Sequence, residues 1–202
     1  MKAILQTQAG NPENQDRGEV IDCGPKLVLV IADGAGGLSG GTEAATMAVD
    51  LVRRNASILD NSDSRLTLLQ NIDRAIAQDK VAGETTCVVA VITNGEIYGA
   101  SVGDSGAWVI GRNGFEDLTK RQTRKPFLGS GCASPVSFQH NVVSGEMLLM
   151  ATDGLFKYTS SERIVSVCRS ASPEYVAQKL LELVRYPSGA LPDDTTIIFT
   201  SL

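Results

Sequence analysis

The chain has 202 residues, 43% of them hydrophobic and 20% charged, and a formal net charge of −5 at pH 7. This composition is typical of a globular protein and argues against disorder or a coiled coil, and the length predicts a single domain over residues 1–202. The acidic balance argues against nucleic acid as the main partner. No apolar run approaches the roughly 18 residues of a membrane span, so we expect no membrane association.

The N-terminal segment and the cysteines indicate the compartment. Residues 1–10 are too short and too polar after Leu5 for a signal peptide. The cysteines are scattered and form no CxxC pair, so we expect free thiols in a reducing, cytoplasmic setting. They are Cys23, Cys87, Cys132 and Cys168.

The first apolar segments predict one buried strand and two helices. Residues 26–32 form a continuous apolar run ending at Asp33, as expected for a strand buried on both faces. Over residues 39–57 and 64–78, apolar residues recur at spacings of three and four, the pattern of an amphipathic helix. We expect Ser39 to cap the first of these helices.

The middle of the chain predicts antiparallel strands. Three β-rich segments over 85–93, 96–102 and 106–111 are joined by short turns, the first of which is an Asn-Gly hairpin turn. A fourth strand is expected over 113–119. These segments therefore form a meander.

The C-terminal part predicts three strands and two helices. Strands are expected in an alternating segment over 135–143, in a buried segment over 146–152 and at the apolar residues 197–199. One helix is expected to begin near Thr159, through a capping box, and another at Ser172. Because helices are segregated from antiparallel strands, the predicted fold class is α+β, a layered sandwich rather than a doubly wound parallel sheet.

Aspartates recur at the ends of these strands. Asp33 and Asp153 each follow a buried strand and precede a glycine, and Asp193 and Asp194 precede the last strand. A lone Asp-Gly is an ordinary turn signal, so the joint occurrence at three strand ends is what indicates a site. Clustered carboxylates repel one another unless cations neutralise them, and hard oxygen ligands without His or Cys indicate Mg²⁺ or Mn²⁺. The carbonyl of Gly34 could join the ligands.

Six motifs follow one another along nearly the whole chain. They are ENQDR at 13–17, VIADGAGG at 30–37, GETTCVVAVI at 83–92, YGASVGDSG at 98–106, LLMATDGLF at 148–156 and PDDTT at 192–196. In these motifs and their order the chain resembles the metal-dependent serine/threonine protein phosphatases of the PPM (type 2C) family, in particular compact bacterial members.

The resemblance implies a four-layer α-β-β-α sandwich, in which two antiparallel sheets are flanked by helix pairs. It also implies two Mg²⁺ or Mn²⁺ ions, with a third, weaker one possible. These ions would activate a water molecule that hydrolyses phosphoserine or phosphothreonine directly, without a phosphoenzyme.

The resemblance also assigns roles to individual residues. Asp33 would bridge two metals, the carbonyl of Gly34 would bind one of them, and Asp153 and Asp193 would bind the other. Asp16 would hold a metal-bound water. Two further acids complete the expected metal set: Asp104 for the third ion, and Asp194 as the second choice to Asp193.

The chain departs from the family pattern around the substrate phosphate. Asn11 stands where the family often has a phosphate-gripping arginine, Ala35 where animal members often have a histidine, and Gly106 where a GDSR turn has arginine. Arg17 is near and could substitute for the missing arginine, or it could be a surface charge. The only histidine, His140, is expected to be a packed structural residue.

A basic segment over 120–125 leaves two interpretations open. Lys120, Arg121, Arg124 and Lys125 could receive a phosphopeptide, or they could form a solvated loop.

Two functions follow from these observations. The first is an active, monomeric phosphoprotein phosphatase that opposes a Ser/Thr kinase. The alternative is a catalytically weak or inactive module that keeps the fold and binds phosphopeptides or regulates a kinase pathway. The intact aspartates favour the first, whereas the departures at Asn11, Ala35 and Gly106 leave room for the second.

Overall fold

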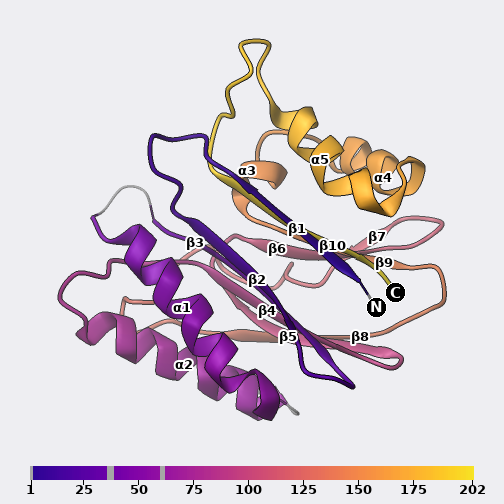
Figure 1. Cartoon of the computed structure of the whole chain (residues 1–202). Coiled ribbons are helices and arrows are strands. Elements are labelled where there is room, and N and C mark those ends of the chain that lie inside the picture. The colour runs from indigo at the N-terminus through magenta and orange to yellow at the C-terminus, as the bar shows by residue number, and fades with distance from the viewer. Residues whose placement is uncertain (1, 36–38, 60–61) are drawn as a thin grey trace.

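A computed structural model describes residues 2–35, 39–59 and 62–202. Two five-stranded antiparallel sheets pack face to face and helices cover the outer faces (Figure 1). The first sheet has the order β1 (Ala3–Gln8), β10 (Thr195–Ser201), β9 (Met147–Ala151), β6 (Gly106–Ile110) and β7 (Phe115–Asp117). The second has the order β2 (Asp16–Asp22), β3 (Leu27–Asp33), β4 (Cys87–Thr93), β5 (Glu96–Val102) and β8 (Val136–Asn141).

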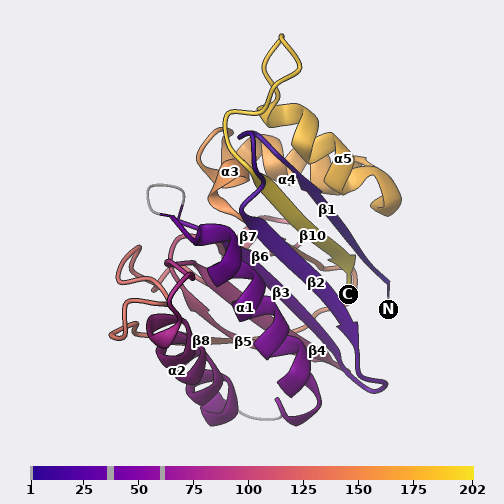
Figure 2. The same cartoon turned by 60° about the vertical axis from the view of Figure 1, so that its left-hand side comes forward.

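The helices form the two outer layers, which Figure 2 shows on opposite sides of the sheets. One layer covers the second sheet and the other covers the first. The first of these layers holds α1 (Gly41–Asn55) and α2 (Ser62–Gln78), and the other holds α3 (Asp153–Phe156), α4 (Ser161–Ser170) and α5 (Pro173–Val184). The predicted α+β, four-layer sandwich is therefore confirmed.

Three apolar layers hold the sandwich together, and β3 contributes to two of them. Val28 and Val30 pack towards α1 and α2, whereas Leu29 and Ile31 pack between the sheets. All four side chains are fully buried. This explains why the strand is continuously apolar rather than alternating, because side chains on both faces of the strand leave water.

The structure adds three elements that the sequence patterns did not predict. Strands β1 and β2 have mostly half-buried residues, so they lack the apolar run that marked β3. Helix α3 is a single short turn directly after β9. Strand β1 pairs with β10 at the other end of the chain, whereas β2 pairs in a hairpin with β3.

Two predicted helix starts are wrong in detail. Helix α1 is preceded by Gly40, whose φ of 88° places it in the left-handed region, and Ser39 makes no cap. Helix α4 is preceded by Ser160 rather than Thr159, and no side chain caps its first turn. The predicted start of α5, with Ser172 at the cap position before Pro173, is confirmed, although the Ser172 side chain makes no capping hydrogen bond. Part of the glycine-rich turn after Asp33 (residues 36–38) lies outside the described residues.

Two general expectations can be compared with the structure. The four cysteines are free thiols, as predicted. Among the helices that the structure describes, none has the length and apolar character needed to cross a bilayer.

Candidate metal centre

The predicted aspartates meet at one end of the sandwich. Asp16 begins β2 and is the direct cross-strand partner of Asp33 at the end of β3. In the other sheet, β9 and β10 are antiparallel, so Asp153 just after β9 and Asp193 just before β10 lie at the same end. These strand ends surround a cavity of about 490 Å³. Five aspartates line it: Asp33, Asp104, Asp153, Asp193 and Asp194.

Glycines allow the segments around this cavity to approach closely. A Cβ on Gly34 would lie 2.4 Å from the carbonyl oxygen of Gly41, which begins α1. A Cβ on Gly154 would lie 2.0 Å from the carbonyl oxygen of Asp194. Any larger residue would push these segments apart, so each glycine brings a strand end against its neighbour.

Asp16 is the most deeply buried acid of the cluster, with 1% of its surface exposed. Its Oδ2 accepts a hydrogen bond from Thr152 Oγ1 at 2.7 Å, whereas its buried Oδ1 has no partner among the described residues. Burial raises the pKa of Asp16 to about 7. An unpartnered buried carboxylate oxygen is costly, so this atom requires a water or a cation as partner.

The backbone of Asp33 is held on both sides while its side chain faces the cavity. Its amide donates to Thr86 Oγ1 at 3.0 Å, and its carbonyl accepts from the Thr86 amide and from Thr85 Oγ1, each at 2.8 Å. Burial, together with the negative charges of Asp16 and Asp153 among others, raises the pKa of Asp33 to about 9. Burial also raises the pKa of Asp153. A bound cation would remove this repulsion.

Asp193 and Asp194 have different surroundings. Asp194 is 6% exposed, and its carboxylate accepts the backbone N–H groups of Gly10, Asn11 and Gln15 at 2.8, 3.1 and 2.8 Å. Asp193 accepts the Asn11 side-chain amide and the Asp194 backbone N–H, both at Oδ1. The described residues therefore leave Oδ2 of Asp193 to the cavity, while Asp194 is engaged in holding the N-terminal loop.

Basic side chains enter the cavity from two elements. Arg124, on the loop after β7, donates from Nε to Asp104 Oδ2 at 2.6 Å. Lys125 lies beside it, and Lys157 extends from the end of α3. The charge of Asp153 raises the pKa of Lys157. Lys157 is a site residue that the sequence analysis missed, although its position four residues after Asp153, one helical turn away, could have indicated it.

The three expected phosphate-binding residues are placed differently. Asn11 and Arg124 line the cavity. Arg17 points towards α1, where its guanidinium donates to the carbonyls of Asn14 and Asp16 and to Thr46 Oγ1. His140 lies elsewhere, between Glu116 and Glu146 at 3.1 and 2.9 Å, as expected for a packed structural residue.

The donor set fits hydrated divalent cations. Among the described residues, no three acidic, histidine or cysteine side chains already converge into a closed metal cage. Mg²⁺ does not need one, because it keeps several waters and is held by one or two carboxylates. The unpartnered Oδ1 of Asp16 and the mutually repelling aspartates are the features that such a cation and its waters would satisfy.

Comparison with known proteins identifies the family. The sequence profile described as Stage II sporulation protein E (SpoIIE) matches residues 24–202. The chain belongs to this family. A curated relative, probable protein phosphatase 2C 62 of Arabidopsis thaliana, is 30% identical over an alignment of 169 residues that covers 76% of this chain and 23% of that protein. The resemblance to type 2C phosphatases predicted from the motifs is thus confirmed.

Solved structures share the fold of this SpoIIE-family chain. The serine/threonine phosphatase Stp1 from Staphylococcus aureus superposes with a TM-score of 0.88 at 20% identity, covering 100% of this chain and 94% of Stp1. The catalytic domain of the phosphatase PstP, in complex with two manganese ions, superposes with a TM-score of 0.76 at 18% identity, covering 98% and 96%. The chain spans less than half the length of the plant relatives it matches.

Proposed function

We propose that the chain is a metal-dependent phosphatase that hydrolyses phosphoserine and phosphothreonine in proteins. One observation carries the proposal: five aspartates line a single cavity, beside a sixth, Asp16, whose buried oxygen has no partner among the described residues. Membership of the SpoIIE family and relatives named as protein phosphatases support it.

Four groups would hold two Mg²⁺ or Mn²⁺ ions: the carboxylates of Asp33, Asp153 and Asp193 and the carbonyl of Gly34. The two manganese ions of PstP support this stoichiometry. Asp104 is the candidate for a third, weaker ion, and Asp194 remains the second choice because its carboxylate already accepts three backbone N–H groups. Bound divalent cations would neutralise the acids, lower the pKa of a water molecule and stabilise charge on the phosphoryl group.

The chain's own residues would orient the water and the substrate. Asp16, fixed through Oδ2 by Thr152, would accept a hydrogen bond from the attacking water at Oδ1. Arg124 would bind the substrate phosphate in place of the arginine that the family often has at the position of Asn11. The side chain of Arg124 is 67% exposed, so a substrate can reach it. The substrate phosphate would compete with Asp104 for its guanidinium.

Asn11 and Lys157 complete the proposed phosphate-binding surface. Asn11 is held at the cavity by its bond to Asp193, and Lys157 adds a positive charge to the same cavity as Arg124. We further propose that the protein acts as a cytoplasmic monomer on phosphoproteins of a Ser/Thr kinase pathway.

Hydrolysis of an aryl phosphate and of a phosphothreonine peptide tests the proposal. Wild type, Asp33→Asn and the control Asp22→Asn are compared with Mn²⁺, with Mg²⁺ and with chelator. Asp22 is an exposed acid at the other end of β2 from Asp16, so its loss makes the same charge change away from the cavity. We expect metal-dependent turnover in wild type and in Asp22→Asn. No metal-dependent turnover in wild type, or full activity in Asp33→Asn, would contradict the proposal.

A further inference from the structure

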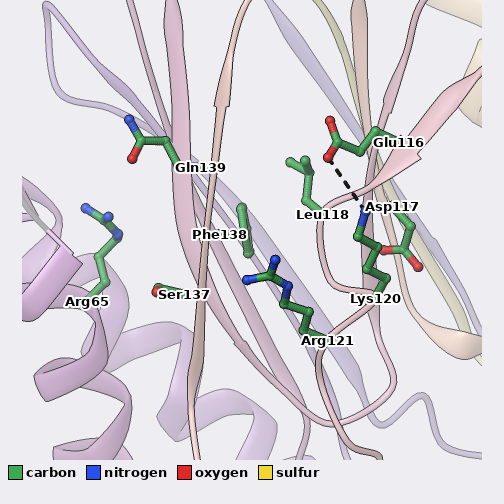
Figure 3. Close-up of a pocket in the computed structure, with 9 residues that line it drawn as sticks. All are labelled: Arg65, Glu116, Asp117, Leu118, Lys120, Arg121, Ser137, Phe138 and Gln139. Atoms are coloured by element: carbon green, nitrogen blue, oxygen red, sulfur yellow. Dashed lines mark ion pairs between the residues drawn. The ribbon is translucent and has the colours of Figure 1, made fainter.

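A second cavity, of about 320 Å³, lies beside β8, the last strand of the second sheet. It is lined by Arg65 of α2, by residues 116–118 with 120 and 121, and by residues 137–139 of β8. Figure 3 shows Arg65 on one side of β8, and Lys120 and Arg121 on the other. Cations from two separate elements therefore flank this strand.

Arg65 is a buried cation with unused donors. Only 4% of its surface is exposed, and its Nε and Nη1 have no hydrogen-bond partner in the described part of the chain. Its guanidinium lies 4.2 Å from the centre of the Tyr98 ring, and Asp63 is the acid whose charge acts on it. The face of an aromatic ring attracts the positive charge of the guanidinium but does not accept hydrogen bonds from its Nε and Nη1 groups. An anion entering the cavity would supply the missing acceptor.

The acids of this cavity already have partners. Asp117 Oδ1 accepts the backbone N–H and the hydroxyl of Thr119 at 2.8 and 2.7 Å. Glu116 contacts His140 Nδ1 at 3.1 Å and Lys120 Nζ at 3.9 Å, the ion pair drawn in Figure 3. These acids are therefore not the counter-ions of Arg65, and the exposed Arg121 adds a second guanidinium to the same cavity.

The backbone of β8 offers hydrogen-bonding groups at this edge. The Val142 amide donates to the Gly95 carbonyl at 2.8 Å, which continues the register in which His140 faces Ile97. Because hydrogen-bonded positions alternate along an antiparallel pair, the backbone groups of Ser137 and Gln139 point away from β5. An extended peptide can pair with such an edge.

The loop after β7 joins this cavity to the metal centre. Arg121 lines the cavity beside β8 and Arg124 lines the aspartate cavity. Three residues of fully extended chain span at most about 11 Å, so the two Cα atoms lie within this distance of one another. A peptide with its phosphorylated residue at the metal centre would therefore reach the β8 edge within a few residues.

We propose that an acidic stretch of the substrate polypeptide, two to five residues from the phosphorylated side chain, lies along β8 and places a carboxylate between Arg65 and Arg121. This inference rests on the proposed function and names its substrate class: phosphoproteins with Asp or Glu beside the phosphorylated residue. An aryl phosphate fills only the metal centre, so its turnover does not involve this subsite.

Matched peptides test the inference. Each carries a central phosphothreonine, flanked on the N-terminal or on the C-terminal side by three glutamates or by three glutamines. Wild type is expected to show a kcat/KM roughly tenfold higher for the glutamate peptide on one side, in line with hydrogen bonds to a charged group. Arg121→Ala should lose this preference and keep its aryl phosphate turnover. Arg121 is exposed, so its truncation is not expected to unfold the protein.

The control is Arg163→Ala, which makes the same charge change on the exposed face of α4, in the opposite helix layer. It should keep the glutamate preference. Arg65→Lys, checked for folding by its melting temperature, should lower the preference as Arg121→Ala does. Equal kcat/KM for glutamate and glutamine peptides in wild type would overturn the inference, as would an unchanged preference in Arg121→Ala.

Two further outcomes concern the proposed function and the oligomeric state. If no variant hydrolyses aryl phosphate with metal, the proposed function fails, and anisotropy with the same labelled peptides on Asp33→Asn tests the subsite alone. If sedimentation shows a dimer that dissociates in Arg121→Ala, a second copy of the chain covers the β8 edge and the inference is wrong.

Discussion

Two pairs of aspartates show how this chain uses carboxylates in opposite ways. Asp73 and Asp194 are 3% and 6% exposed, and each accepts three backbone N–H groups. Asp16 and Asp33 lie at the cavity with raised pKa values, and one oxygen of Asp16 has no partner among the described residues. The first pair stabilises loops, whereas the second pair is costly to the fold without a cation.

The largest expected effect is on activity. Asp33→Asn should lower kcat by about a hundredfold or more with Mn²⁺, because it replaces a carboxylate that would bind the proposed cations with a neutral amide. Initial rates on an aryl phosphate measure this. Activity within a factor of two of wild type would place the metal ligands elsewhere.

The next expected effect separates the two pairs by stability. Asp194→Ala should lower the free energy of unfolding by about 2–4 kcal/mol, because three backbone N–H groups lose their acceptor. Asp73→Ala should do the same through Gly129, Gly131 and Ala133. Urea unfolding measures both, and Asp22→Ala is the control: this exposed acid accepts a single backbone N–H, from Gly24 at 2.9 Å, so we expect a loss of at most about 1 kcal/mol. A change that small in Asp194→Ala would remove the distinction between the two pairs.

In the metal-free protein Asp33, from the second pair, should behave in the opposite way. Asp33→Asn should raise the free energy of unfolding in chelator by about 1–3 kcal/mol at pH 8, because the wild-type carboxyl, ionised in the unfolded chain, must take up a proton to be buried among the other acids, whereas the amide of asparagine is always neutral.

The pH dependence of this difference follows from the pKa of Asp33. This pKa is about 9 in the folded protein against about 3.8 for an unperturbed aspartate, so the folded state binds the proton more tightly. The contribution of Asp33 to stability is therefore complete below about pH 4 and lost as the pH rises towards 9. The advantage of Asp33→Asn should grow over the same window. Unfolding curves at several pH values in chelator measure it, and a constant difference would contradict this account.

The sequence predicts the interior of this molecule better than its edges. The apolar run over 26–32 predicted β3, because both faces of that strand are buried. Strands β1 and β2 carry mostly half-buried residues, so neither shows the apolar run of β3; β1 depends on pairing with the distant β10, and β2 on its hairpin with β3. The motifs placed Asp33 and Asp153 correctly at strand ends, but Asp193 and Asp194 are chemically alike and adjacent. Only contacts with residues 10–15, nearly 180 residues away, distinguish them.

The smallest expected effect concerns the arginine proposed to bind the substrate phosphate. The sequence left Arg17 open for this role, and the cavity favours Arg124. Arg124→Ala should raise KM for a phosphothreonine peptide roughly tenfold with a smaller change in kcat, because a charge-assisted hydrogen bond to the phosphate is lost. Arg124→Lys should restore part of the affinity, since it keeps the charge without the planar donor pair.

Arg17→Ala is the matched test of the alternative. Its guanidinium is already bonded to two backbone carbonyls and to Thr46, so its removal should leave KM within about a factor of two. The reverse result, in which KM rises in Arg17→Ala and stays unchanged in Arg124→Ala, would mean that the Arg17 side chain breaks its contact with α1 to bind the substrate. Arg124 would then stay paired with Asp104, and that acid would belong with the partnered carboxylates rather than with the candidate metal ligands.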